Sequence, residues 1–179
     1  MSGTAAEIAT RELVMEWQKP QLNWYKCNID AGFHHEAGKT SASWCVRDYM
    51  GRFVSAGSSW INGRCSINEG EAIAMLEAIK ELHQRGYTNV TFETDSLNVV
   101  NTIYNMHSGV SEFSSIVCKI KCMLSNRCDF EVKSIKRQTN MVVHTLARAA
   151  ISWPSRCIFE LIPSCIEYLL YNFLLSKKS

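Results

Sequence analysis

The feature that most constrains the fold of this chain is a change in the period of its apolar residues. In residues 24–30 apolar and polar side chains alternate, which is typical of a strand with one buried face. Residues 40–47 and 53–60 are rich in β-branched and aromatic side chains, and the polar turn of residues 48–51 between them favours a hairpin. Over residues 68–85 the apolar side chains instead recur every three or four positions, as in a helix. The chain is therefore predicted to begin with three antiparallel strands followed by a helix.

Strands and helices alternate through the next part of the sequence. The predicted elements are a buried strand at 90–94, a helix capped by Ser96, a helix at 111–124, a strand at 130–135 and a helix at 140–150. Three strands before any helix, followed by alternation, predict an α/β fold in which a five-stranded mixed sheet carries helices on both faces.

The predicted domain covers residues 23–152 and is flanked by two extensions. Residues 1–22 form an N-terminal extension with a loose helical pattern over residues 5–17, and residues 153–179 form an apolar tail that is expected to be helical. Proline and charged side chains interrupt the tail, so no transmembrane segment is predicted. Hydrophobic residues make up 46% of the chain and charged residues 20%, which agrees with a folded globular protein.

Charge and cysteine content restrict the location and the partners of the protein. The net charge of +2 gives no global basic field, so any affinity for nucleic acid has to come from a local patch. The eight cysteines include no Cys-x-x-Cys pair and do not form a zinc framework. The first ten residues lack the basic start and the apolar stretch of a secretory signal. These features predict an intracellular protein of the nucleus or cytoplasm whose thiols stay free.

Three carboxylates, Asp30, Glu71 and Asp95, stand at positions that the predicted sheet brings together. Each has a plainer interpretation when taken alone: Asp30 as a turn former at the end of the first strand, Glu71 as the capping-box partner of Asn68, and Asp95 as a helix cap. If the first strand and the strand before Asp95 are parallel neighbours, and the helix of Glu71 crosses them, all three meet at one spot. Such an oxygen-only set suits Mg²⁺, and two such ions can drive phosphodiester hydrolysis.

Four sequence blocks around these residues resemble the ribonuclease H family in order and spacing. The closest resemblance is to the plant branch related to the ribonuclease H portion of non-LTR retrotransposon reverse transcriptases. The blocks are residues 26–30, 71–78, 93–96 and 143–150. The resemblance implies a five-stranded mixed sheet, a site of four acidic residues that binds two Mg²⁺ or Mn²⁺ ions, and endonucleolytic cleavage of the RNA strand of RNA–DNA hybrids. Asp30, Glu71 and Asp95 fall on the first three acidic positions.

The fourth acidic position of the family is occupied by His144. Imidazole is a nitrogen donor that Mg²⁺ favours less than carboxylate, and the change removes one negative charge. We therefore expect His144 to act at the fourth catalytic position with weaker binding of one metal ion, slower turnover and a relative preference for Mn²⁺. The alternative is that His144 is a polar residue near a helix start without a ligand role.

Recognition of the substrate is expected to depend on its shape and on its 2′-hydroxyls rather than on base sequence. The candidate contacts are polar side chains around the carboxylates and a set of basic side chains for the phosphates: Asn28, Ser96, Asn98, Asn101, Arg137, Lys119, Lys121 and Arg127.

Two functions of other classes are compatible with the same sequence. One is a nucleic-acid-binding module that has kept the fold and lost the chemistry through His144. The intact carboxylates favour the enzyme, and the missing fourth one favours the module. The other is a protein-interaction domain that uses the apolar tail, residues 158–175, as a docking helix. The simpler interpretation of that tail is a helix packed on the domain.

Overall fold

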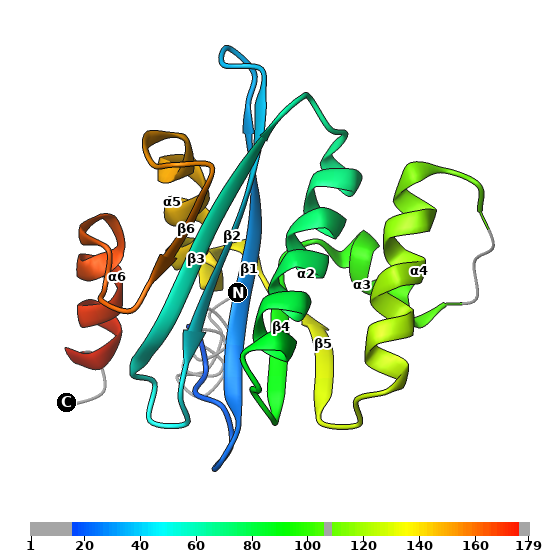
Figure 1. Ribbon diagram of the computed structural model, residues 1–179. Coiled ribbons are helices and arrows are strands. Elements are labelled where there is room, and N and C mark those ends of the chain that lie inside the picture. Colours follow the sequence, from blue (N-terminus) through cyan, green and yellow to red (C-terminus); the bar gives the residue numbers. More distant parts are fainter. Residues whose placement is uncertain (1–15, 106–108, 176–179) are drawn as a thin grey trace, which may run out of the picture.

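A six-stranded mixed sheet forms the centre of the molecule in the computed structural model, which describes residues 16–105 and 109–175 (Figure 1). Its strands are β1 (Tyr25–His34), β2 (Lys39–Arg47), β3 (Phe53–Asn62), β4 (Val90–Thr94), β5 (Phe130–Ser134) and β6 (Arg156–Phe159). They lie in the order β5-β4-β1-β2-β3-β6. β4 runs parallel to β1 and to β5, whereas the other neighbouring pairs are antiparallel. The predicted mixed sheet is confirmed, with one strand more than expected.

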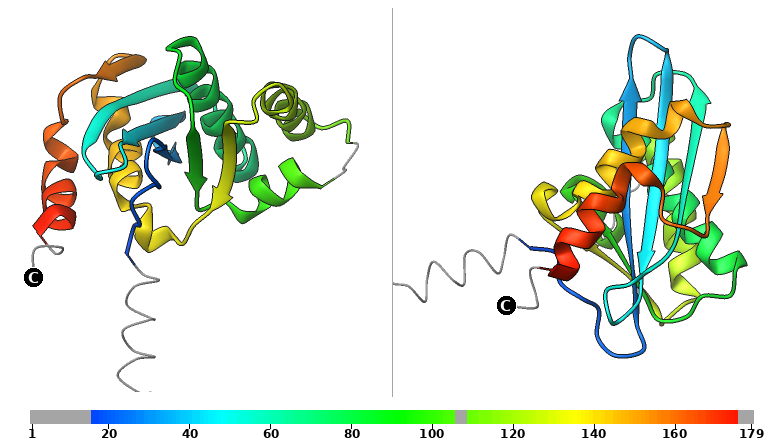
Figure 2. Two further views of the ribbon diagram at one scale, coloured as in Figure 1. Left: turned by 90° about the horizontal axis from the view of Figure 1, so that it is seen from below. Right: turned by 90° about the vertical axis from the view of Figure 1, so that its left-hand side faces the viewer.

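Helices cover both faces of this sheet, as predicted (Figure 2). They are α2 (Ile67–Gln84), α3 (Leu97–Tyr104), α4 (Glu112–Ser125), α5 (Met141–Ala149) and α6 (Ser164–Leu175), with short 3₁₀ helices η1 (Arg137–Thr139) and η2 (Ala150–Ser152). α2 packs on β1 and β2, with α3 and α4 beside it. α5 packs on the same two strands from the other face, with α6 beside it.

An apolar core lies on each side of the sheet. Ile29 of β1 is buried in the larger core with Met75 of α2, and Cys45 of β2 is buried in the second core with Leu146 of α5. Successive side chains of a strand point to opposite faces. The side chain of Asn28, the neighbour of Ile29, therefore lies on the α5 side of β1. This alternation decides which residues of β1 support the candidate site.

The C-terminal tail departs from the prediction in its first part. Residues 156–159 form β6, which pairs with β3, and only after that strand does the chain form α6. Ile166 and Leu170 of α6 are buried against α5 in the second core. The prediction of a helix in the tail is right for α6, and the short strand before it was missed.

Two further expectations concern the termini and the cysteines. The helical pattern over residues 5–17 falls, except for its last two residues, outside the part of the chain that the structure describes. The eight cysteines form no disulfide within the described residues. Within residues 16–105 and 109–175 no helix combines the length and the apolar character that a membrane span requires.

Candidate active site

Asp30 lies in the middle of β1 rather than at its end. The strand continues to His34, and Asp30 is paired with Ser43 of β2. On the other side, the parallel pairing with β4 stops at Ile29 and Thr94. Since β4 ends there, no strand among the described residues continues along that side of β1, and side chains from other elements can approach Asp30 from it. The interpretation of Asp30 as a turn former is wrong.

Glu71 lies in the second turn of α2 and does not cap that helix. The N-cap is Ser66, whose hydroxyl accepts a hydrogen bond from the backbone N–H of Glu69, while the Glu69 carboxylate accepts one from the backbone N–H of Ser66. The predicted cap at Asn68 is therefore wrong, because the helix begins two residues earlier than that cap requires. Glu71 is left free of a capping role and is buried.

Asp95 stands between β4 and α3. The cap of α3 is the next residue, Ser96, whose hydroxyl accepts from the backbone N–H of Val99, as predicted. Asp95 is therefore not needed as the cap. β4 runs parallel to β1, which is the arrangement that a meeting of the carboxylates requires, and its carboxyl end brings Asp95 to the side of Asp30.

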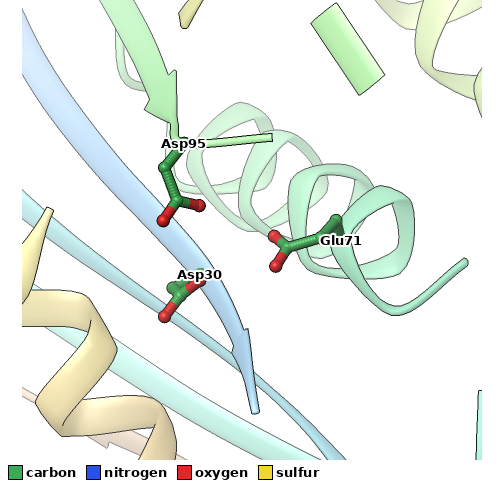
Figure 3. A group of neighbouring side chains, drawn as sticks. All are labelled: Asp30, Glu71 and Asp95. Carbon is green, nitrogen blue, oxygen red and sulfur yellow. The ribbon is translucent and has the colours of Figure 1, made fainter. Parts of the chain in front are cut away.

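The three carboxylates point toward one another from β1, from α2 and from the segment directly after β4 (Figure 3). One oxygen each from Asp30, Glu71 and Asp95 lies within 4.8 Å of the other two. The Oε2 atom of Glu71 is buried and has no hydrogen-bond partner among the described residues. Leaving a buried acceptor unpaired costs free energy, and a cation bound at the cluster would satisfy it. The oxygen-only donor set is of the kind that Mg²⁺ and other hard divalent cations prefer.

Burial and mutual repulsion raise the pKa values of two of these groups. Burial, followed by the charge of Asp95, raises the pKa of Asp30 to about 6, although the hydrogen bond with His144 acts in the opposite direction. Burial, followed by the charges of Asp30 and Asp95, raises the pKa of Glu71 to about 9. Without a cation Glu71 therefore holds a proton at neutral pH, and a divalent cation bound at the cluster would replace it.

His144 contacts the carboxylate cluster directly. It lies in the first turns of α5, and its Nδ1 atom is 2.9 Å from Oδ2 of Asp30. The Nη2 atom of Arg137 is 3.3 Å from Nε2 of the same ring. A guanidinium can only donate hydrogen bonds, so Nε2 accepts this one. The proton of the ring is then on Nδ1, and Nδ1–H donates a hydrogen bond to Asp30. The geometry places His144 in the site, while a role as metal ligand stays a prediction.

The carboxylates lie in an open pocket of about 740 Å³ that also has basic lining residues. Lys136, Arg137 and Arg148 come from the segment that runs from the end of β5 through α5. Phe33 and Ile67 contribute apolar surface to the same pocket. An acidic cluster that can hold cations and a neighbouring set of basic side chains are together suited to a phosphodiester backbone.

The predicted nucleic-acid contacts do not all lie in this pocket. Ser96 and Arg137 line it. Asn98 and Asn101 are exposed but are not part of its lining. The prediction for Asn28 is wrong. Its side chain lies on the α5 face of β1 beneath other polar groups and is fully buried, so it cannot contact a substrate.

The three other basic candidates are not part of the pocket. Arg127 lies near the start of β4, at the end of that strand opposite to the carboxylates, and donates two hydrogen bonds to Asp129. Lys121 donates to the backbone carbonyl of Asn105. Lys119 lines a separate groove along α4. The structure therefore does not bring these cations to the carboxylates.

Sequence reasoning missed several residues of the pocket, among them Lys136, Arg148 and Phe33. Arg148 follows His144 by one helical turn, so the helical period of the last predicted helix places both on one face, and that spacing was a usable signal. Phe33 lies in the part of β1 beyond its predicted end. No local pattern identified it.

Residues 28–150 match the family described as reverse transcriptase-like. An Arabidopsis thaliana protein named "Putative ribonuclease H protein" is 25% identical over 160 residues, which are 89% of this chain and 26% of that protein. The chain thus spans about a quarter of the length of this relative.

Solved structures share the fold. RNase H1 from the halophilic archaeon Halobacterium salinarum has a TM-score of 0.64 at 19% identity, covering 72% of this chain and 97% of that chain. LC11-RNase H1, isolated from compost by a metagenomic approach, has a TM-score of 0.64 at 20% identity, covering 73% and 97%. A structure of LC11-RNase H1 in complex with an RNA/DNA hybrid has a TM-score of 0.62 at 19% identity, covering 72% and 96%. At these identities the likeness establishes the mixed sheet with helices on both faces.

Proposed function

This chain belongs to the reverse transcriptase-like family and has a ribonuclease H-like fold, and we propose that it is a divalent-metal-dependent endonuclease that cleaves the RNA strand of RNA–DNA hybrids. The observation that carries the proposal is the cluster of Asp30, Glu71 and Asp95, with ligand oxygens within 4.8 Å of one another. The names of similar proteins support it, since the Arabidopsis relative is named for ribonuclease H and one structural neighbour holds an RNA/DNA hybrid.

The same three residues would hold the metal ions. The unpartnered Oε2 of Glu71 and the raised pKa values of Glu71 and Asp30 fit a site that gains stability when a cation displaces protons. When bound, two Mg²⁺ or Mn²⁺ ions supply an activated water and stabilise the leaving oxygen. The contribution of the chain is to hold three carboxyl groups together, from β1, from α2 and from the segment directly after β4, before the cations arrive. Water adds to the phosphorus, the P–O3′ bond breaks, and the products carry a 5′-phosphate and a 3′-hydroxyl.

The basic residues of the pocket would bind the phosphates of the substrate. Lys136 and Arg137 are exposed side chains before α5, and Arg148 lines the pocket from α5 itself. Such contacts set the position and the register of a duplex without reading its bases. The 2′-hydroxyls of the RNA strand, displayed in the wide minor groove, would then distinguish a hybrid from a DNA duplex.

His144 is expected to weaken the metal site without dismantling it. Its Nδ1–H donates to Asp30, so part of the negative charge of that carboxylate is already engaged. A carboxylate at this position would add negative charge, whereas imidazole adds none in its neutral form. We therefore expect weaker metal binding and slower cleavage than a site with four carboxylates would give.

The contact between His144 and Asp30 also favours a second candidate function. If the imidazole keeps Asp30 from binding a metal ion, the chain becomes a nucleic-acid-binding module with the same pocket and no cleavage. The two functions differ in one respect that can be measured, which is whether Mg²⁺ or Mn²⁺ supports hydrolysis.

The experiment is cleavage of an end-labelled RNA–DNA hybrid with Mg²⁺ or Mn²⁺ by the natural protein, Asp30→Asn and His144→Asp. RNA–RNA and DNA–DNA duplexes of the same sequence are the substrate controls. We expect cleavage of the hybrid alone, its loss in Asp30→Asn and its acceleration in His144→Asp. If neither the natural protein nor a correctly folded His144→Asp variant cuts, the enzyme is excluded, and retained binding of the hybrid would support the module.

A further inference from the structure

A cluster of buried polar side chains lies behind the candidate site, on the α5 face of β1. Its members are Asn28, Arg47, Glu93 and Asn140, none of which is more than 3% exposed. We call this group the buried polar cluster. Burying an arginine and a glutamate costs several kcal/mol per ion in general, and apolar residues of similar volume often serve stability equally well. Stability alone therefore does not explain the cluster.

The hydrogen bonds of the cluster converge on the side-chain amide of Asn28. Its Oδ1 accepts from Nη2 of Arg47 at 2.9 Å. Its Nδ2 is 3.1 Å from Oε2 of Glu93 and 3.2 Å from Oδ1 of Asn140. The second carboxylate oxygen of Glu93 is 2.7 Å from Nζ of Lys26. The amide of Asn28 is thus oriented by partners on three other elements, which fixes the direction in which it holds Asn140.

Asn140 joins the two segments that carry Asp30 and His144. Its Nδ2 donates to the backbone carbonyl of Ile29, the residue before Asp30, at 2.9 Å. Its own backbone carbonyl accepts from the backbone N–H of His144 at 3.1 Å. One residue therefore connects the start of α5 to β1 immediately beside the contact between His144 and Asp30. A displacement of Asn140 would change the relative position of these two groups.

Trp17, from the segment before β1, stacks on Arg47 of this cluster. Its ring centroid is 3.5 Å from Cζ of Arg47, and the residue is 6% exposed. The backbone carbonyl of the next residue, Gln18, accepts a hydrogen bond from Nζ of Lys26 at 2.7 Å. An aromatic ring over a guanidinium is attractive and also excludes water, and hydrogen bonds are stronger where water is excluded.

We infer that Trp17 and Asn140 are positioning residues for the carboxylate site, acting through the buried polar cluster. Trp17 shields Arg47, Arg47 orients Asn28, and Asn28 holds Asn140, which fixes α5 against β1. The segment before β1 thereby becomes part of the support of the site, although it lies outside residues 28–150 that match the family. The inference about α5 stands on the geometry alone, and its consequence for metal binding rests on the proposed function.

The test compares Asn140→Ala and Trp17→Ala with two matched controls, Asn126→Ala and Trp60→Ala. Asn126 caps the end of α4, and Trp60 donates from Nε1 to the backbone carbonyl of Trp153, so neither touches the cluster. Three quantities are measured: Mn²⁺ affinity by calorimetry, hydrogen exchange of the amides in the first turn of α5, and the free energy of unfolding in urea. Trp17→Phe, which keeps a ring over Arg47, is the conservative variant.

We expect Asn140→Ala and Trp17→Ala to weaken Mn²⁺ binding by roughly 10- to 100-fold, as the loss of residues that orient metal ligands commonly does. Both should also speed amide exchange at the start of α5, and Trp17→Phe should restore most of both properties. The controls should lose stability without a change in Mn²⁺ affinity or in α5 exchange.

Unchanged Mn²⁺ affinity and unchanged α5 exchange in Asn140→Ala and Trp17→Ala would overturn the inference, whatever their stability. If the natural protein binds no Mn²⁺ and cuts no hybrid, the proposed function fails. The exchange of the α5 amides then decides the positioning role by itself, since it requires no metal. Should Asn140→Ala not fold, the pair Trp17→Ala and Trp17→Phe provides the same comparison.

Discussion

The two ends of β4 hold acidic side chains in opposite circumstances. Beyond its carboxyl end, Asp95 lies with Asp30 and Glu71, and burial and repulsion raise the pKa of the latter two. At its amino end, Asp129 accepts hydrogen bonds from Nε and Nη2 of Arg127 at 2.8 and 2.9 Å. That guanidinium holds the pKa of Asp129 well below its usual value. Among the described residues, no lysine or arginine forms an ion pair with the acid groups at the carboxyl end, whereas the acid group at the amino end is paired with Arg127.

This difference distinguishes a candidate metal-binding site from an ion pair that only stabilises the fold. A paired carboxylate stabilises the fold in its charged form, so it needs nothing from outside the chain. Clustered carboxylates without compensating charge destabilise the folded protein unless protons or cations bind to them. His144 and Arg137 are near the cluster, but only the imidazole contacts it, through Asp30. The comparison predicts that neutralising an acid group has opposite effects on stability at the two ends.

The largest effect is expected at Glu71. Glu71→Gln removes one charge of the cluster while keeping the shape of the side chain, and cleavage of the hybrid should fall by roughly 10²- to 10³-fold, as with other losses of a preorganised electrostatic contact. In the absence of metal the same variant should be more stable than the natural protein at neutral pH, because Gln resembles the protonated form that the folded protein favours. Cleavage rates and urea unfolding in a chelator measure the two effects.

Asp129→Asn is the matched control for that variant. It changes one acid group to its amide at the other end of β4, so it should keep its cleavage activity and lose stability. If Glu71→Gln retained full cleavage, or if Asp129→Asn abolished it, the assignment of the two ends would have to be reversed or abandoned.

The second largest effect is expected on the free energy of unfolding when a metal ion binds to the carboxylate cluster. A ligand that binds only the folded state adds about 2.7 kcal/mol to the free energy of unfolding when its concentration is 100 times its dissociation constant. Thermal unfolding with and without saturating Mn²⁺ should therefore show a rise of several degrees in Tm. Glu71→Gln should lose most of this rise and Asp129→Asn should keep it. An equal rise in both variants would place the metal elsewhere.

The sequence was sufficient to locate the carboxylates, because their meeting depends on element order and on one pairing. The strand before Asp30 and the strand before Asp95 were visible from period and composition, and a parallel pairing between them aligns their carboxyl ends. The helix of Glu71 was equally visible, but its start was not. The sequence Ser66-Ile67-Asn68-Glu69-Gly70-Glu71 offers two capping boxes with the same spacing, and only the structure shows that Ser66 and Glu69 form one.

The support of the site could not be predicted from local patterns. Alternation placed Asn28 on one face of β1, but it did not show that Asn140 and Arg47 would bury it. The contact of Trp17 with Arg47 joins the N-terminal extension to the middle of the sheet. Hydrophobic periodicity describes only local structure, so it does not predict a contact between residues so far apart in the sequence. β6 was missed for a similar reason: four residues in an apolar segment become a strand only because β3 offers a free edge for them.

The smallest expected effect concerns the dependence of stability on pH, and it has opposite signs at the two ends. For Asp129 the pKa is lower in the folded protein than in the unfolded chain, so its contribution is fully present above about pH 4 and is lost as the pH falls below that value toward the folded pKa. Asp129→Asn should therefore cost about 1 kcal/mol at pH 7 and almost nothing in more acidic solution.

For Glu71 the folded pKa of about 9 lies above the value of 4.5 for an unperturbed glutamate, so the folded protein binds the proton more tightly than the unfolded chain does. Its unfavourable contribution is absent below about pH 4.5 and grows as the pH rises toward 9. Glu71→Gln should gain stability relative to the natural protein over that interval when metal is absent. Urea unfolding in a chelator measures the two slopes, between pH 5 and 8 for Glu71→Gln and below about pH 4 for Asp129→Asn, whose difference should be flat between pH 5 and 8. Parallel slopes would mean that the two ends of β4 do not differ in charge compensation, because only a proton held at the cluster in the folded state can make the Glu71→Gln difference increase with pH.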